Sequence, residues 1–124
     1  MWTNLFNGVY RCPTDKKVSP LMSYGLNVFF ELGPYDSYVG SPQTWRRLAQ
    51  IPKPATTVLA AEVGTAADHI MPHFWISLQD ARGEVAWRRH REKSIYSFVD
   101  GHAQLLPLTQ TYSPPALDWW NPLQ

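Results

Sequence analysis

The feature that most constrains the fold of this chain is its proline content. Eleven prolines are spread over the 124 residues, and a proline interrupts both helix interiors and the central strands of a sheet. Short elements joined by rigid turns are therefore expected. The patterns do not alternate strand and helix as in a doubly wound sheet. We predict an α+β fold, an antiparallel β-sheet meander of about five or six strands with one short helix, in a single domain over residues 1–124.

One segment carries the signals of a helix. Residues 41–51 open on a Ser-Pro pair, in which serine can cap exposed amides and proline suits the first helical position. Trp45, Leu48 and Ile51 recur at a spacing of three, which places them on one face of a helix. Pro52 follows and cannot continue the helix. We therefore predict that the short helix occupies this segment.

Strands are predicted where aromatic and β-branched residues form short runs. The predicted strand ranges are 24–32, 56–63, 94–99 and 103–108, with a further hairpin formed by 74–79 and 84–89. In that hairpin, apolar and polar residues alternate with the period of a half-buried strand. Residues 64–72 are expected to be a loop, and residues 113–124 are expected to pack over the sheet as irregular chain.

The dipeptide Asp100-Gly101 separates two of these apolar runs. An Asp-Gly pair between strands favours a two-residue hairpin turn of type I′, in which both residues have positive φ. A hairpin is therefore predicted at this point.

The charge balance favours no polyanionic partner. The net charge is +1 at pH 7, so binding to nucleic acid is not predicted. The single cysteine, Cys12, cannot form an internal disulfide, and cysteine usage therefore does not indicate a compartment. Residues 1–124 hold no apolar run of the roughly 20 residues that span a bilayer. The first residues also lack the basic region and apolar core of a signal peptide.

Three residues near the Asp-Gly dipeptide are candidate metal ligands. His90, Asp100 and His102 could share zinc or another transition metal if the chain folds back across the turn. The alternative is that Asp100 and Gly101 only build the turn, while the histidines hydrogen-bond to backbone or face water. We favour the alternative because a metal site demands tight ligand geometry.

Other residues with reactive side chains are also weighed. Cys12 could form a nucleophilic pair with a distant histidine, although a single cysteine beside a proline turn is more often buried. Glu62 could be a buried carboxylate with a raised pKa, or it could face a partner or water at a strand edge. His69 and His73 have the spacing of a helical metal pair, but the intervening Pro72 argues against a helix. We assign no catalytic residue, no metal ligand and no cofactor.

The chain contains six tryptophans. Two of them, Trp119 and Trp120, are adjacent in the proline-rich tail. As an exposed pair they could stack on sugar rings or anchor a partner protein, because aromatic side chains dominate interaction hot spots. The alternative is that they fill the core, which is the interpretation favoured for most of the tryptophans.

Several segments, taken in order, resemble one family. His90 is followed by nine residues and then by Asp100-Gly101-His102, with Phe98 two residues before the aspartate. Three upstream segments also match. Tyr10-Arg11-Cys12-Pro13-Thr14-Asp15 looks like the family's Cys-Pro-Ser-Asp segment, and Ser23-Tyr24-Gly25-Leu26-Asn27 matches its Ser-Tyr-x-x-Asn segment. Residues 54–62 resemble the family's strand that ends in an acidic residue. Together they resemble the prepilin-type processing-associated H-X9-DG domain, a family similar to type II secretion pseudopilins and type IV pilins. Where that family often has Gly-Gly and an Asn between the histidine and the phenylalanine, this chain has Arg91-Glu92-Lys93 and Ile95.

The resemblance implies a pilin-like globular head in which His90, Phe98, Asp100, Gly101 and His102 form a structural turn. It implies a non-catalytic structural subunit of a type IV pilus or a type II secretion pseudopilus-like filament, located in the periplasm or at the cell surface. Its partners would be other pilin or pseudopilin subunits. It would reach the membrane only through an N-terminal apolar helix absent from this chain, either trimmed or supplied by a separate chain. The alternative is an extracytoplasmic carbohydrate- or protein-binding module that uses exposed aromatics.

Overall fold

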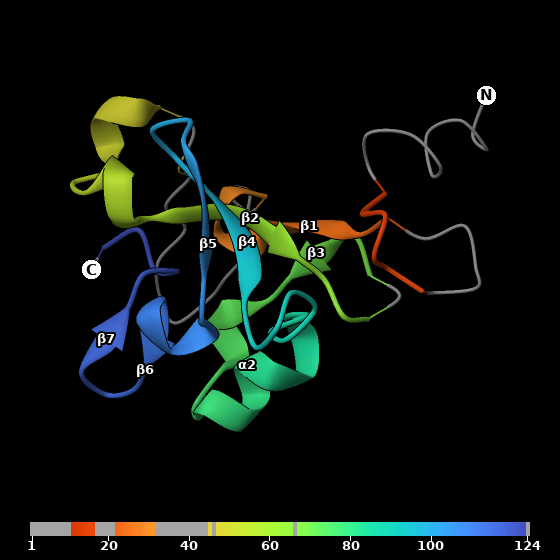
Figure 1. Cartoon of the computed structure of the whole chain (residues 1–124). Helices are drawn as coiled ribbons and strands as arrows, with labels where there is room; N and C mark the ends of the chain where they lie inside the picture. The colour runs from red at the N-terminus through yellow and green to blue at the C-terminus, as the bar shows by residue number, and fades with distance from the viewer. Residues whose placement is uncertain (1–10, 17–21, 32–44, 46, 66, 124) are drawn as a thin grey trace.

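A five-stranded sheet is the main feature of the computed structural model, which describes residues 11–16, 22–31, 45, 47–65 and 67–123. The strand order is β3-β1-β2-β4-β5 (Figure 1). The strands are β1 Tyr24–Asn27, β2 Val58–Glu62, β3 His69–Ile70, β4 Ser94–Phe98 and β5 Ala103–Leu106. Neighbours pair antiparallel, except that β3 runs parallel to β1 at one edge. The α+β class is therefore confirmed.

The sheet is mixed, so the prediction of a purely antiparallel meander is wrong at this edge. Residues 64–72, expected to be a loop, contain β3, which pairs with β1 through Leu26 and His69. Gly25 permits the pairing, since a Cβ there would lie 3.3 Å from Ile70 Cγ1 and 3.4 Å from the His69 backbone. Close backbone approach is a use of glycine that hydrophobic patterning does not reveal.

The two central strands, β2 and β4, follow the sequence patterns closely. In β4, Ser94, Tyr96 and Phe98 are buried and the alternate residues are half-buried, which is the period of two expected of a strand. β2 has Val58, Ala61 and Glu62 buried and its other two residues half-buried, as expected for a strand between two neighbours. The strands predicted at 56–63 and 94–99 are thereby confirmed.

The hairpin predicted around Asp100-Gly101 is confirmed, but its turn is of another type. Gly101 has a φ of 97°, whereas Asp100 does not have positive φ, so the turn is not type I′. The Gly101 N–H donates to the Phe98 carbonyl at 2.9 Å, and the Phe98 N–H donates to the His102 carbonyl at 2.8 Å. This is the pattern of a three-residue loop with glycine in the left-handed position.

Residues 74–89 form no hairpin, because the segment contains the helix α2 Leu78–Glu84. The Oδ2 atom of Asp80 accepts hydrogen bonds from the N–H groups of Ile76 at 2.9 Å and Ser77 at 2.8 Å. These bonds, in that order, together with one from the Ser77 hydroxyl, hold the pKa of Asp80 below its ordinary value. A carboxylate that satisfies free amides favours a helix start at this position.

The apolar alternation that suggested a strand here does not come from a buried strand face. Phe74 and Ile76 are 67% and 87% exposed, so the alternating residues do not line a buried face. Phe74 ends a short 3-10 helix, Pro72–Phe74. Alternation predicts a strand only if one set of residues is buried, and that condition fails here.

The helix predicted over residues 41–51 starts outside the described residues. Its described end is a 3-10 helix, Leu48–Gln50. Trp45 and Ile51 are buried together, but Leu48 is 60% exposed. The prediction of one shared face is wrong for Leu48, because the described helix has only three residues and the backbone is extended at Arg47 and Ile51 on either side of it.

Asn27 ends β1 earlier than predicted, since the expected strand covered 24–32. Its Oδ1 accepts from a backbone N–H of the 3-10 helix Val28–Phe30 at 3.2 Å. Its Nδ2 donates to the Val58 carbonyl at 2.8 Å and to the Trp120 carbonyl at 2.9 Å. One buried amide therefore joins β1, β2 and the C-terminal segment.

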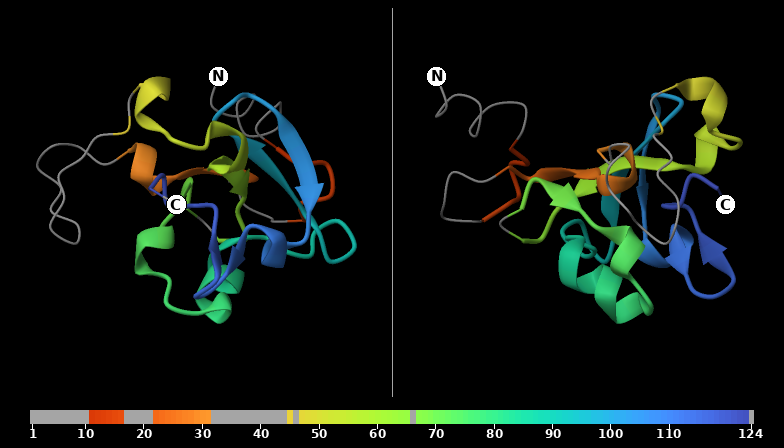
Figure 2. Two further views of the ribbon diagram at one scale, coloured as in Figure 1. Left: turned by 90° about the vertical axis from the view of Figure 1, so that its left-hand side faces the viewer. Right: turned by 180° about the vertical axis from the view of Figure 1, so that it is seen from behind.

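The C-terminal segment lies on the same side of the sheet as α2 (Figure 1 and Figure 2). It is not wholly irregular, as had been expected, because β6 Tyr112–Ser113 and β7 Leu117–Asp118 form a second, two-stranded sheet. Trp120 follows and is 0% exposed. The buried core lies between these layers and comprises Val58, Ala61, Val63, Ile70, Trp75, Ala81, Val85, Tyr96, Phe98, Leu106, Leu108, Tyr112 and Trp120.

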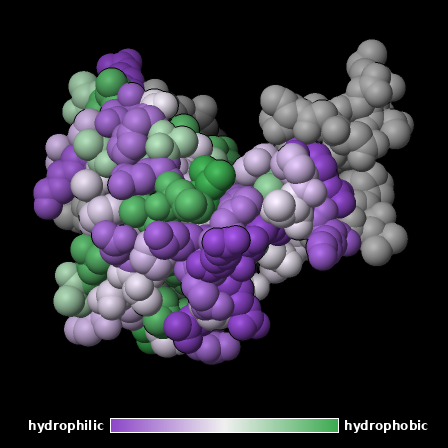
Figure 3. Space-filling model, in the orientation of Figure 1, coloured by the Kyte–Doolittle hydropathy of each residue, from purple (hydrophilic) through white to green (hydrophobic). Residues whose placement is uncertain are grey.

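Some large hydrophobic side chains remain at the surface. Those exposed in the described part of the chain are Leu48, Phe74, Ile76, Leu105 and Leu123. On the face drawn in Figure 3, hydrophobic residues form short stretches among hydrophilic ones. Scattered exposure of this kind is usual for folded proteins and marks no binding site by itself.

Candidate functional site

The three candidate metal ligands around the turn do not converge. Asp100 Oδ1 accepts from the His102 N–H at 3.1 Å and lies 2.5 Å from His102 Nδ1. The His102 ring stacks on Phe98, with the ring centroids 4.4 Å apart. His90 makes its contacts near the opposite end of β4. The two ends of β4 are four residue steps apart, or about 13 Å at the usual strand rise. Asp100 and Gly101 build the turn, as the favoured interpretation has it. Its other half is wrong for His90, whose side chain contacts the carboxylate of Glu62, and incomplete for His102, which is exposed but also contacts the carboxylate of Asp100.

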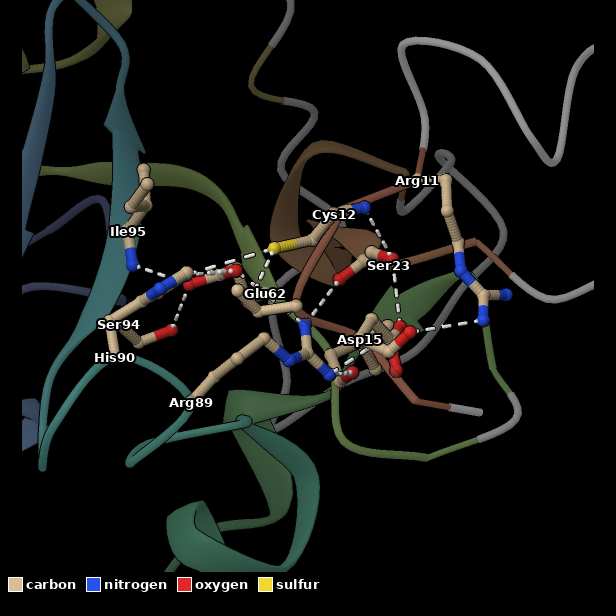
Figure 4. A network of polar contacts seen from close by, with 11 residues as sticks. Arg11, Cys12, Asp15, Ser23, Glu62, Arg89, His90, Ser94 and Ile95 are labelled. Carbon is tan, nitrogen blue, oxygen red and sulfur yellow. Dashed lines mark hydrogen bonds and ion pairs between the residues drawn. The ribbon is translucent and has the colours of Figure 1, made fainter. Parts of the chain in front are cut away.

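His90 belongs instead to a buried polar network that joins distant segments of the chain (Figure 4). Its Nε2 lies 2.9 Å from Glu62 Oε1 and 3.8 Å from Cys12 Sγ. Glu62 is the last residue of β2 and is completely buried. Its other oxygen, Oε2, accepts from the Ser94 hydroxyl at 2.9 Å and the Ile95 N–H at 2.8 Å. The end of β2 is thereby tied to the start of β4.

Cys12 and Ser23 form the second half of this network. The Cys12 N–H donates to Ser23 Oγ at 2.7 Å, and the Ser23 hydroxyl donates to Asp15 Oδ2 at 2.7 Å. The Asp15 N–H donates to the Cys12 carbonyl at 2.9 Å, which closes the turn predicted over this segment. All three residues are buried, so these hydrogen bonds replace the water that the polar groups lose on folding.

Arg89 links the two halves. Its Nη2 lies 3.6 Å from Asp15 Oδ2, and its Nη1 lies 3.6 Å from Glu62 Oε1. The same guanidinium donates to the carbonyls of Ser23 at 3.3 Å and Val63 at 3.0 Å. Its side chain is only 10% exposed, and a buried charge of this kind requires such partners.

Glu62 is an ionised carboxylate within this buried network. Burial alone would raise its pKa, but hydrogen bonds from the Ile95 N–H and from the side chains of His90, Ser94 and Cys12 together bring the pKa below its ordinary value. The prediction that Glu62 could be a buried carboxylate is confirmed, but the predicted direction of its pKa shift and the alternative of a strand-edge position are wrong. Its pKa is not raised, and its side chain faces neither water nor a partner.

The contacts of His90 do not favour a thiol nucleophile. In a nucleophilic pair, the histidine takes the thiol proton at one ring nitrogen while an acidic group holds the other. Here the same Nε2 faces both Glu62 and Cys12. A hydrogen on Nε2 that is donated to Glu62 leaves no lone pair there for the thiol proton. Cys12 is also only 3% exposed, which leaves little room for a substrate.

The same three side chains have another chemical capacity. The thiol sulfur of Cys12, one carboxylate oxygen of Glu62 and one ring nitrogen of His90 all lie within 4.8 Å of one another. Thiolate, imidazole and carboxylate are ligands of transition metals such as zinc.

His90 is held in the network by a tight loop. Its N–H donates to the Lys93 carbonyl at 3.0 Å. Between these residues, Arg91 and Glu92 have φ values of 55° and 66°. A left-handed conformation costs roughly 1–2 kcal/mol for a residue other than glycine. The loop therefore has a strained backbone directly after His90, the residue that joins Glu62 and Cys12 in the network.

Sequence reasoning named His90, Cys12 and Glu62 separately, but it did not bring them together, and it missed Asp15, Ser23 and Arg89 as members of the network. The signal for most of them was the resemblance itself, because Cys12, Asp15, Ser23 and Glu62 all lie in its upstream segments. No such signal exists for Arg89, which lies in an ordinary basic run. Spacing alone could not indicate that segments so far apart in the sequence meet.

The adjacent tryptophans of the tail have different environments. Trp120 is fully buried, its Nε1 donates to Thr111 Oγ1 at 3.2 Å, and its ring packs edge-on against Trp75 with centroids 5.0 Å apart. Trp119 is half-buried and packs against Phe98. The two side chains therefore do not form an exposed stacking pair, and Trp120 serves the core.

The fold and the network together define a small α+β protein that is braced by buried ionic and polar contacts. Comparison of the chain with protein-family models, with curated proteins and with solved structures found no match. Among the described residues, no helix has the length and apolar character needed to cross a membrane. The function is therefore argued from the motif residues and from the contacts they make.

Proposed function

We propose that this chain is the globular head of a pilin-like or pseudopilin-like subunit. In this proposal it is a non-catalytic structural component of a type IV pilus or a type II secretion pseudopilus-like filament. It acts in the periplasm or at the cell surface, and its partners are other subunits of the filament. An apolar helix that reaches the membrane and the filament core is attached to it or assembled with it.

The observation that carries the proposal is that the upstream segments of the resemblance meet His90 in one place, while Asp100-Gly101-His102 forms the hairpin turn at the other end of β4. The motif residues that contact one another are Cys12, Asp15, Ser23, Glu62 and His90. Residues that recur together in a family and also pack together have a shared structural reason to recur. This supports the resemblance beyond the match of letters, although a shared fold does not assign chemistry.

The loop after His90 gives independent support. The family often has Gly-Gly in this part of the motif, and here Arg91 and Glu92 have the positive φ values that glycine adopts without cost. The backbone thus keeps a shape suited to the family's glycines, although the side chains differ. The replacement of the family's glycines by Arg91 and Glu92 is therefore compatible with the same loop conformation.

The burial of the network supports a structural role rather than a catalytic one. Cys12, Glu62 and Asp15 are buried, and their partners belong to the same chain. Each contact ties the segment before β1 to the ends of β2 and β4. A brace of this kind suits a head that must keep its shape in a filament.

The proposal is tested by detecting the chain in filaments sheared from the cells that make it. An antibody against residues 11–123 should detect the chain in the sheared fraction together with other filament subunits. In cells that lack the peptidase that removes prepilin leaders, the chain should leave that fraction. An unrelated surface protein serves as the loading control. Recovery with cytosolic proteins alone in both strains would overturn the proposal.

A further inference from the structure

Three side chains of the buried network that braces the sheet are also of the types that bind transition metals. The Sγ of Cys12, the Oε1 of Glu62 and the Nε2 of His90 lie within 4.8 Å of one another. We infer that these three side chains form a binding site for one divalent transition-metal ion of the zinc class. This inference is independent of the filament proposal, because it concerns only the contacts within this chain.

The separations of the ligand atoms agree with a tetrahedral ion. Zinc bonds of about 2.3 Å to sulfur and 2.0–2.1 Å to nitrogen or oxygen require a sulfur–nitrogen separation of about 3.5 Å and a nitrogen–oxygen separation of about 3.3 Å. The observed separations are 3.8 Å from Cys12 Sγ to His90 Nε2 and 2.9 Å from His90 Nε2 to Glu62 Oε1. These two separations differ from the tetrahedral values by about half an ångström or less, and the third, between Cys12 Sγ and the Glu62 carboxylate, is within 4.8 Å.

The side chains that would bind the ion are held by further contacts. Glu62 keeps Oε1 toward the other ligands because its Oε2 is fixed by the Ser94 hydroxyl and the Ile95 N–H. The Cys12 backbone is fixed by Ser23 at 2.7 Å. Outer partners of this kind orient metal ligands and raise the affinity of the site.

The strained loop provides a second, independent observation at the same point. The left-handed residues Arg91 and Glu92 directly follow His90, and backbone strain gathers where a side chain must be positioned for function. The His90 side chain is 24% exposed, whereas that of Glu62 is 0% exposed. An ion therefore reaches the site from the side of His90.

The ligand types select the ion. A thiolate with an imidazole and a single carboxylate suits zinc and related transition metals, whereas calcium and magnesium prefer oxygen ligands alone. Binding requires the Cys12 thiolate and an unprotonated Nε2 on His90. The thiol proton passes to solvent, and the imidazole proton moves from Nε2 to Nδ1 as the hydrogen bond to Glu62 is replaced by the ion.

Titration of the purified, reduced chain with cobalt(II) after chelator treatment tests the inference. One equivalent should bind and give a thiolate-to-cobalt charge-transfer absorption, which zinc should remove by displacing the cobalt. Cys12→Ser should lose this absorption, and His90→Gln should weaken binding by about tenfold or more. His102→Gln is the matched control, since it removes a histidine that also contacts a carboxylate, and it should bind as the unchanged chain does.

A second measurement uses only the unchanged chain, so that it does not depend on whether the variants fold. The melting temperature of the unchanged chain should rise with zinc concentration, because a ligand that binds only the folded state stabilises it, and magnesium should have no such effect. Absence of the charge-transfer band in the unchanged chain overturns the inference. Equal loss of affinity in His90→Gln and His102→Gln, or weakening in His102→Gln alone, also overturns it.

Discussion

At the scale of single residues, two glycines in the described structure differ in whether their backbone conformation requires glycine. Gly101 occupies the left-handed position of the β4–β5 loop, with a φ of 97°. Gly83 lies inside α2, where such freedom has no structural use. At both positions a Cβ would have open space, with no atom within 4 Å. Any difference between substitutions at these sites must therefore come from backbone conformation.

Alanine at these two positions should have opposite effects on stability. Gly101→Ala should destabilise by about 1–2 kcal/mol, because an L side chain resists positive φ. Gly83→Ala should stabilise by about 0.4–1 kcal/mol, because alanine restricts the unfolded chain at a position where the folded backbone is helical. Urea denaturation monitored by fluorescence measures both free energies of unfolding. Equal shifts in the same direction would show that the turn at Gly101 is not left-handed.

At the scale of elements, the sequence predicted correctly the strands whose residue pattern is caused by burial in the sheet. Strands 56–63 and 94–99 are buried by regular alternation or continuous apolar character, and both form. The hairpin at Asp100-Gly101 forms because a turn dipeptide separates two apolar runs. Its type was wrong, since a two-residue and a three-residue loop use the same glycine.

Elements that depend on tertiary partners were not predictable in this way. α2 is held by Asp80, whose carboxylate accepts from the amides of Ile76 and Ser77, while apolar alternation in the same segment indicated a strand. β3 pairs with β1 beside Gly25, where a Cβ would be in tight contact with Ile70. The polar network was likewise hidden, because Cys12, Glu62 and His90 are brought together only by the sheet.

The C-terminal segment gives an element-scale prediction. Trp120 packs edge-on against Trp75 and Tyr96, with centroids 5.0 and 6.1 Å away, and it is fully buried. Trp120→Ala should therefore lower the free energy of unfolding by about 3–5 kcal/mol, the usual cost of removing a buried aromatic side chain.

The adjacent residue supplies the control. Trp119 is half-buried, so Trp119→Ala should cost less, about 1 kcal/mol. Chemical denaturation of the three proteins gives the comparison. A larger loss at Trp119 than at Trp120 would mean that the tail packs with the other tryptophan inward.

At the scale of the whole molecule, two internal braces hold the sheet to its surroundings. One is the network of Cys12, Asp15, Glu62, Arg89 and His90, which joins the segment before β1 to β2 and β4. The other is Asn27, which ties β1 to β2 and to the C-terminal segment. Contacts between segments far apart in sequence favour a single fixed shape, which the proposed filament head requires.

The most direct test of the proposed function is the intact mass and N-terminal sequence of the native protein, taken from the cells that make it. The proposal predicts an apolar helix with a processed, methylated first residue upstream of the head, or a separate helical chain that co-purifies with it in stoichiometric amount. A native protein with neither an attached apolar helix nor such a partner would contradict the proposal that this chain is a filament subunit.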